Sequence, residues 1–230
     1  MAARSPPRSA AILLSACSSI PRRASKRGSG CCATFWSGPM SERRSDATIT
    51  ESPDGDGVAV VEELDERALG ELCEATALAV ADGEDIAWVH PPKQSVLAAY
   101  WKGILLAPHR RLLVARHDGR ICGAVQLILP GAINEAGAHA GEIATFFVAP
   151  WARGHGNARA LLEQVEAEAR AAGLKVLDFS IRADRKAGIA LVESLGYRRW
   201  AEKPHYAFIN GTFVPGYFYT KTLNGEEPGG

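Results

Sequence analysis

The stretch FFVAPWARGHGNARALLEQVEAEARAAG, residues 146–173, passes from an apolar run to a long amphipathic segment across two glycines. The apolar run predicts a buried strand, and apolar side chains at helical spacing predict a helix over 158–172. Gly173 is a typical residue at the end of a helix. The side chains expected to face the core are Ala158, Leu161, Leu162, Val165 and Ala169. Loop 153–156 therefore lies where a strand becomes a helix.

This loop has the composition of an anion-binding site. The first N–H groups of a helix have no intrahelical partner, and the helix dipole adds partial positive charge at the same end. Gly154 and Gly156 lack a Cβ, so an anion can reach the backbone and a positive φ costs little. Arg153 can bind phosphate through two parallel hydrogen bonds. The pattern favours phosphate, and a diphosphate would use several amides at once.

Two common phosphate loops do not fit these residues. A dinucleotide-binding fingerprint follows the first strand of a βαβ unit and needs a third glycine, where this sequence has Arg159. A Walker loop needs Gly-Lys followed by Ser or Thr, which this sequence lacks. A tight turn without a ligand remains the alternative, although such a turn would not require the arginine.

The patterns around the loop predict the element order β-α-α-β-β-β-α-β-α-β-β. Asp118-Gly119, between two apolar runs, indicates a hairpin. The expected strands are 58–64, 110–116, 121–129, 141–149, 174–181, 197–203 and 212–223, and the expected helices are 65–85, 94–106, 158–173 and 184–196. This order predicts an α/β fold of the α+β type, with a mixed, mostly antiparallel central sheet flanked by helices. We expect one domain over 57–223 and a flexible tail over 224–230.

Residues 1–56 differ from the rest of the chain and are expected to be disordered. Residues 1–41 contain six Lys or Arg and no acidic residue, with many Ser, Pro, Gly and Ala. This composition fits an organelle transit peptide. The sequence Leu-Ser-Ala-Cys at 14–17 resembles a bacterial lipoprotein cleavage site. A non-native extension before Met40 is the third interpretation, and we favour it.

The overall composition excludes several classes of partner. The formal net charge is +0 and the pI is about 7.0, so no basic excess favours nucleic acid. No apolar run approaches the roughly 20 residues of a membrane span. The five cysteines lack metal-ligand spacing and are expected to be reduced thiols in the cytoplasm. We expect no nucleic acid, membrane or metal, and leave a homodimer open.

Two motifs carry a resemblance to a known family. Val148-x-Pro150-x-x-Arg153-Gly154-x-Gly156-x-Ala158 resembles the acetyl-CoA motif of the GCN5-related N-acetyltransferases, the GNAT family. The stretch 191–197, Leu-Val-Glu-Ser-Leu-Gly-Tyr, resembles the second signature of that family, in the same order along the chain. The resemblance covers about residues 58–222.

The resemblance implies acetyl-CoA as co-substrate and assigns residues to it. The backbone of Phe146 and Val148 should pair with the pantetheine arm, as an added strand would. The amides over 154–159 should hold the pyrophosphate, with Asn157 and Arg159 facing the cofactor. His155 lies within this cofactor-binding loop, and we expect its side chain to be solvated.

The catalytic residues of the family do not simply carry over. The tyrosine that usually protonates the departing thiolate falls on Val192, the asparagine before it on Arg185, and the base glutamate of some members on Ser180. Coenzyme A is a fair leaving group even without an acid, because a simple thiol has a pKa near about 8.5.

Other residues are candidates for these roles. Glu142, at the start of the strand before the loop, is the first candidate for the base, because many family members have a carboxylate in this strand that acts through water. Asp178 is the second candidate. Tyr206, or else His205, could supply the missing acid. Each of these side chains could instead be solvated, structural or packed.

The acceptor side is expected where the second helix and the loop before it meet the last strands. Aromatic side chains can contact a cation or an apolar ligand. The candidates for substrate contact are Trp88, Tyr100 and Trp101, with His90. At helical spacing such residues could equally belong to the core.

The resulting prediction is an acetyl-CoA-dependent N-acetyltransferase that acts on a primary amine, with a small molecule as the expected acceptor. A protein N-terminus or lysine is the alternative acceptor. A non-catalytic acyl-CoA-binding module is the alternative from another functional class, and Val192 is the residue that keeps it open.

Overall fold

The computed structural model describes residues 55–84 and 86–224 of the 230-residue chain. The chain divides into two units, residues 1–48 and 49–230, and every described residue belongs to the second unit. The interpretations of residues 1–54 and of the end of the tail lie outside the described residues, and the domain boundaries at 57 and 223 stay predictions. No described helix is long and apolar enough to cross a membrane.

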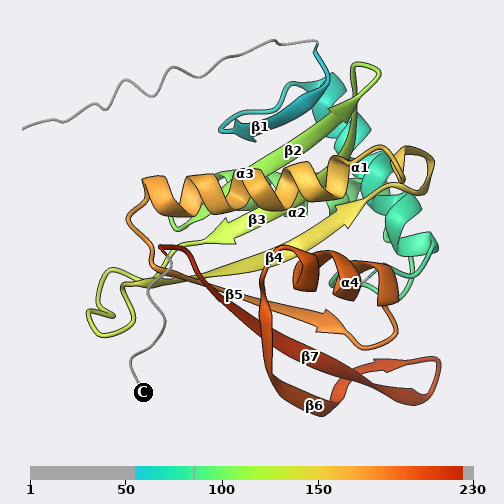
Figure 1. The fold of residues 1–230 in the computed structure, drawn as a ribbon. Helices are drawn as coiled ribbons and strands as arrows, with labels where there is room; N and C mark the ends of the chain where they lie inside the picture. Colours follow the sequence, from blue (N-terminus) through green and yellow to red (C-terminus); the bar gives the residue numbers. More distant parts are fainter. Residues whose placement is uncertain (1–54, 85, 225–230) are drawn as a thin grey trace, which may run out of the picture. The chain divides into compact units, whose positions relative to one another are not determined.

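The described residues form four α-helices, one short 3-10 helix and a seven-stranded sheet (Figure 1). The strands are β1 (Gly57–Val61), β2 (Arg110–His117), β3 (Arg120–Ile128), β4 (Ala140–Val148), β5 (Val176–Arg182), β6 (Arg198–Ile209) and β7 (Thr212–Thr222). The helices are α1 (Glu66–Ala81), α2 (Gln94–Leu105), η1 (Pro150–Ala152), α3 (Asn157–Ala171) and α4 (Lys186–Ser194). The sheet order is β1-β2-β3-β4-β5-β7-β6, and only β4–β5 is parallel. The fold class is therefore the expected one.

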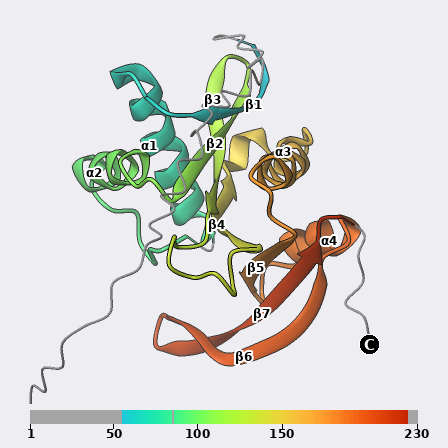
Figure 2. The same cartoon turned by 90° about the vertical axis from the view of Figure 1, so that its left-hand side faces the viewer.

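Helices cover both faces of the sheet, α3 and α4 on one face and α1 and α2 on the other (Figures 1 and 2). On the α3 face, Leu161, Leu162 and Val165 are 0% exposed, which confirms the predicted apolar stripe. On the opposite face, the core contains Leu72, Leu97 and other side chains of α1 and α2. Each amphipathic helix therefore buries its apolar side against one face of the same sheet.

Strand β6 is longer than the sequence predicted. The expected strand ended at 203, whereas the observed strand continues through Pro204 to Ile209. Its register with β7 shifts between Lys203 and Ala207, so Pro204 lies in an irregular part of an edge strand. An edge strand tolerates a proline there, because no ladder hydrogen bond needs the missing N–H.

Strands β4 and β5 pair over only part of their lengths. The pairs run from Ala140–Val176 to Ile143–Phe179. Beyond them β5 continues to pair with β7, and β4 continues to pair with β3 as far as Val148. The edge of β4 over residues 144–148 therefore has no strand partner on the β5 side. This separation positions the candidate site.

Candidate active site

A cavity of about 790 Å³ lies where β4 and β5 separate. Its walls come from β4, the loop before α3, β5 and the first turn of α4. The predicted site residues that line it are Glu142, Phe146, Val148, Arg153, Gly154, Gly156, Asn157, Ala158, Arg159 and Tyr206. This volume lies within the roughly 300–1,000 Å³ that is usual for ligand pockets. The structure therefore brings the predicted cofactor loop and both predicted catalytic residues to one cavity.

Strand β4 leaves β5 at a bulge around Thr145. The register with β3 shifts between Ala124 and Gln126, so β4 contains one extra residue. The φ angle of Thr145 is 48°, which is unusual for a β-branched residue. The Tyr100 hydroxyl lies 2.9 Å from Thr145 Oγ1 and accepts a 3.0 Å hydrogen bond from Gln126 Nε2. A bulge bends its strand, and this hydrogen-bonded chain holds the bend in place.

The glycines of the loop adopt the conformation that the sequence predicts. Gly154 and Gly156 both have φ of 83°, in the left-handed region that glycine enters readily. Gly156 is the N-cap of α3 and supplies no side-chain acceptor. The first amides of α3 are therefore left for another acceptor, such as an anion. The Asn157 side chain donates a 3.0 Å hydrogen bond to the Ala152 carbonyl and so steadies the loop.

Arg153 already has protein partners. Its Nη1 lies 2.6 Å from Asp82 Oδ2, its Nη2 lies 2.7 Å from Glu84 Oε1, and its Nε donates to the Val148 carbonyl at 3.3 Å. Burial raises the pKa of Glu84, and the Arg153 charge opposes that rise. Arg153 therefore joins the end of α1 to the end of β4, and its contact with phosphate stays a prediction.

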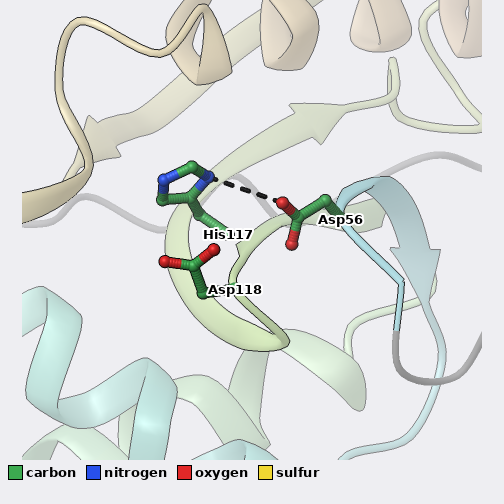
Figure 3. Close-up of side chains that lie close together, drawn as sticks. All are labelled: Asp56, His117 and Asp118. Atoms are coloured by element: carbon green, nitrogen blue, oxygen red, sulfur yellow. Dashed lines mark ion pairs between the residues drawn. The ribbon is translucent and has the colours of Figure 1, made fainter.

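His155 is exposed, as expected, and does not line the cavity. Its ring centroid lies 4.4 Å from that of His117. The His117 Nδ1 atom lies 3.6 Å from Asp56 Oδ2, and Figure 3 shows this pair with Asp118 at the turn between β2 and β3. Ligand atoms of these three residues lie within 4.8 Å of one another, and among the described residues they are the one group that could hold a metal. The group lies outside the cavity, and the absence of a catalytic metal stays a prediction.

The candidate base and the candidate acid come from two different strands, β4 and β6. Glu142 on β4 lies opposite Asp178 of β5 in the sheet register. The Tyr206 hydroxyl, from β6, lies 3.0 Å from Ser180 Oγ of β5. The Tyr206 ring occupies the space over Gly216, where an added Cβ would come within 3 Å of the ring. Glu142 and Tyr206 therefore both line the cavity, and their catalytic roles stay predictions.

The aromatic residues expected at the acceptor side do not line the cavity. Trp101 is 0% exposed, and its indole Nε1 donates a 3.2 Å hydrogen bond to Thr76 Oγ1. The prediction that Trp101 contacts substrate was wrong, because the side chain belongs to the core. Tyr100 acts behind the cavity wall, through its contact with Thr145. Trp88 packs edge-on against Tyr100, with ring centroids 4.9 Å apart.

The residues around the first turn of α4 were not among the predicted site residues. Asp184, Arg185, Lys186 and Gly188 all line the cavity. Burial acts to raise the pKa of Asp184, but its hydrogen bond to Arg182 and the charges of Arg182 and Arg185 lower that pKa overall. Basic side chains at a helix start suit phosphate. The signal in the sequence was Asp-Arg-Lys at the start of the helix predicted over 184–196.

Comparison with known proteins identifies the family. Residues 77–197 match the Acetyltransferase (GNAT) family. An uncharacterized N-acetyltransferase from the hisH–hisA intergenic region of Azospirillum brasilense is 48% identical over 118 residues, which cover 51% of this chain and 70% of that protein. The IAA acetyltransferase of Azospirillum brasilense is 36% identical over 150 residues, which cover 64% of this chain and 80% of that protein.

A solved structure shares the fold. The yncA protein of Salmonella typhimurium, solved with its cofactor acetyl-CoA, has a TM-score of 0.62 and 20% identity, covering 76% of this chain and 98% of that one. At that identity the likeness concerns the fold alone, and the assignment rests on the matched residues, the 48% identical relative and the glycine loop at the cavity. The chain belongs to the Acetyltransferase (GNAT) family and is an N-acetyltransferase.

Proposed function

We propose that this enzyme transfers the acetyl group of acetyl-CoA to the primary amine of a small molecule, by direct attack of the amine on the thioester. The observation that carries the proposal is one cavity that contains both the anion-binding loop and the pair Glu142 and Tyr206. Cofactor and chemistry therefore share one space, as a direct transfer requires.

The residues at the cavity fit acetyl-CoA. The unpaired edge of β4 over residues 144–148 offers backbone groups to the pantetheine arm. The amides at the start of α3 follow two glycines with left-handed φ and suit the pyrophosphate. Arg159, Arg185 and Lys186 add positive charge along the lining. Each of these features supports a long, thin, anionic ligand.

Glu142 is the proposed base. An alkylamine has a pKa of about 10, so at neutral pH it arrives mostly as an ammonium ion, which cannot attack the thioester. The Glu142 carboxylate accepts the ammonium proton through a water molecule. The freed nitrogen then forms a bond to the thioester carbon, and the bond between that carbon and sulfur breaks.

Tyr206 is the proposed acid. The departing thiolate takes the proton of the Tyr206 hydroxyl, and the resulting phenolate takes the proton that the attacking nitrogen gives up as it becomes a neutral amide. Glu142 then returns its proton to solvent, so that the protons balance over a turnover. Ser180 Oγ, at 3.0 Å, can hold the hydroxyl in position. Val192 falls at the usual tyrosine position and has no ionisable proton to give, and its side chain is 0% exposed. Tyr206 reaches the cavity from β6 instead of from α4.

Thermal unfolding of the full chain with acetyl-CoA, with free coenzyme A and with ATP tests the cofactor assignment. At 100 times its dissociation constant a ligand should stabilise the protein by about 2.7 kcal/mol. We expect a shift with both coenzyme A species and little with ATP. Failure of both coenzyme A species to shift the transition would overturn the proposal.

Release of free thiol upon addition of amines tests the reaction itself. Thiol release with small amines supports the proposal. Release only with peptides that carry a free N-terminus or lysine would replace the small molecule by a protein acceptor. Binding of acetyl-CoA without thiol release from either class would indicate a non-catalytic acyl-CoA-binding module.

A further inference from the structure

A second hollow, of about 440 Å³, adjoins the cofactor cavity. Glu142, Phe179 and Ser180 line both spaces, so the two meet at the proposed base. The hollow lies between the end of β3 with the loop that follows it and the strands β5, β6 and β7. In Figure 2 the β6–β7 hairpin curves towards the side of the sheet that carries α1 and α2.

The outer walls of this hollow are apolar. Leu129 and Pro130 form one wall, and Trp200 and Phe218 form another. The Trp200 side chain is 66% exposed, and its ring centroid lies 6.0 Å from that of Phe218. A large aromatic side chain exposed beside a cavity is typical of a ligand-binding surface.

The inner end of the hollow is anionic. Glu142 and Asp178 both line it and lie directly opposite each other on neighbouring strands. Like charges in such a cross-strand pair destabilise a sheet. Within residues 55–84 and 86–224, neither carboxylate has a hydrogen bond or ion pair to a cationic side chain. A cation from a ligand would offset their repulsion.

We propose that this hollow binds the acceptor and selects primary amines that carry an aromatic or branched apolar body. The ammonium group contacts Glu142 and Asp178, and the apolar body lies between Pro130 and the Trp200–Phe218 wall. The inference rests on the proposed function, and it adds the class of acceptor. It excludes small hydrophilic amines and carboxylated acceptors as good substrates, because the former leave the apolar walls wet and the latter meet two carboxylates.

Comparing two amines separates the contribution of the apolar body from that of the amino group. We expect 2-phenylethylamine to have a kcat/KM at least about tenfold higher than ethanolamine, since apolar contacts in a pocket discriminate by factors of this order. Trp200→Ala should lower kcat/KM for 2-phenylethylamine about tenfold and leave that for ethanolamine nearly unchanged. Phe208→Ala is the matched control, because Phe208 is 59% exposed on the same hairpin and lines neither space.

Preference for ethanolamine, or equal losses for both amines in Trp200→Ala, would overturn the inference while the acetyl-transfer function stands. A second measurement applies if the enzyme acetylates neither of these two amines. Titration of the acetyl-CoA-loaded protein with 2-phenylethylamine by calorimetry should show saturable binding that Trp200→Ala weakens. No such binding overturns the inference, whereas failure to bind acetyl-CoA at all overturns the proposed function.

Discussion

The two halves of β4 share one strand and have opposite roles. Over residues 140–143 the backbone is paired with β5, whereas over 144–148 that edge borders the cavity. The difference arises at Thr145, where one extra residue bends the strand. The cavity therefore opens where β4 and β5 stop forming hydrogen bonds to each other. Glu142 lies next to the last pair of the closed half, beside the opening.

The largest expected effect is that of changing Glu142, which lies at the boundary between the two halves of β4. Glu142→Gln should lower kcat/KM for an amine about 10²–10⁴-fold at neutral pH, because general-base help is lost. The loss should shrink as the pH approaches the amine pKa of about 10, where free amine needs no base. The pH–rate profile is the measurement. Asp178→Asn is the matched control and should keep the shape of the profile; if it alone changes that shape, Asp178 is the base.

Removal of the Trp101 side chain, which supports the open half of β4 from behind, should have the next largest effect. Trp101→Ala should lower the free energy of unfolding by about 3–5 kcal/mol, because it empties a fully buried aromatic site. Val96→Ala, at a residue 48% exposed on the same helix, should change it by at most about 0.5 kcal/mol. Denaturant unfolding measures both. Similar small losses in the two variants would contradict the assignment of Trp101 to the core of the α2 face.

The two ends of α3 offer a matched pair of glycines. Gly156 has φ of 83° and Gly173 has φ of 79°, and a Cβ at either residue would meet no neighbour within 4 Å. Changing either to alanine should cost about 1–2 kcal/mol of stability, since each residue stays left-handed. Only Gly156→Ala should also weaken acetyl-CoA binding, which calorimetry measures. Equal affinities in the two variants would contradict the anion site at the open half.

A smaller effect is expected from the hydrogen bond that holds the bulge. Tyr100→Phe should lower the free energy of unfolding by about 0.5–1.5 kcal/mol. Thr145→Val removes the other partner of the 2.9 Å contact, so the double variant should lose less than the sum of the two single losses. Denaturant unfolding of all four proteins gives the coupling. Strict additivity would mean that Tyr100 does not hold the bend.

The last effect concerns the closed half and is confined to alkaline pH. Burial and the hydrogen bond to Glu193 raise the pKa of Tyr219 to about 12, and Tyr219 pairs with Phe179 in the sheet. A tyrosine in the unfolded chain has a pKa of about 10. Because the folded state holds Tyr219 neutral up to a higher pH, the protein should lose stability as the pH rises from about 10 to 12. Urea unfolding at several alkaline pH values measures this loss. Tyr219→Phe should weaken the dependence; an unchanged dependence would rule Tyr219 out as its source.

The parts of the site that are local in sequence could be predicted. The apolar stripe of α3 and the left-handed glycines follow from spacing and residue type within one stretch of chain. Phe146, which lines the cavity, was assigned to the site by resemblance. The fold class followed from the order of such stretches. Glu142 and Tyr206 were placed at the cavity by resemblance, and their chemistry still awaits a test.

The parts assembled from distant segments could not be predicted. Arg153 pairs with Asp82 and Glu84, about seventy residues earlier, and no local pattern announces this contact. Trp101 follows Tyr100 on α2, and adjacent positions on a helix point in different directions, so composition alone does not say which one is buried. The apolar hollow beside Glu142 joins β3, β6 and β7, which only the fold brings together.

The unpaired edge of β4 has a consequence for self-association. An exposed strand edge invites another protein chain to add a strand, and proteins usually protect such edges. This edge lies in the interior of the sheet, with β5 and the first turn of α4 across the cavity. It is therefore not an outer edge to which another polypeptide could simply add a strand, although its backbone groups border a cavity.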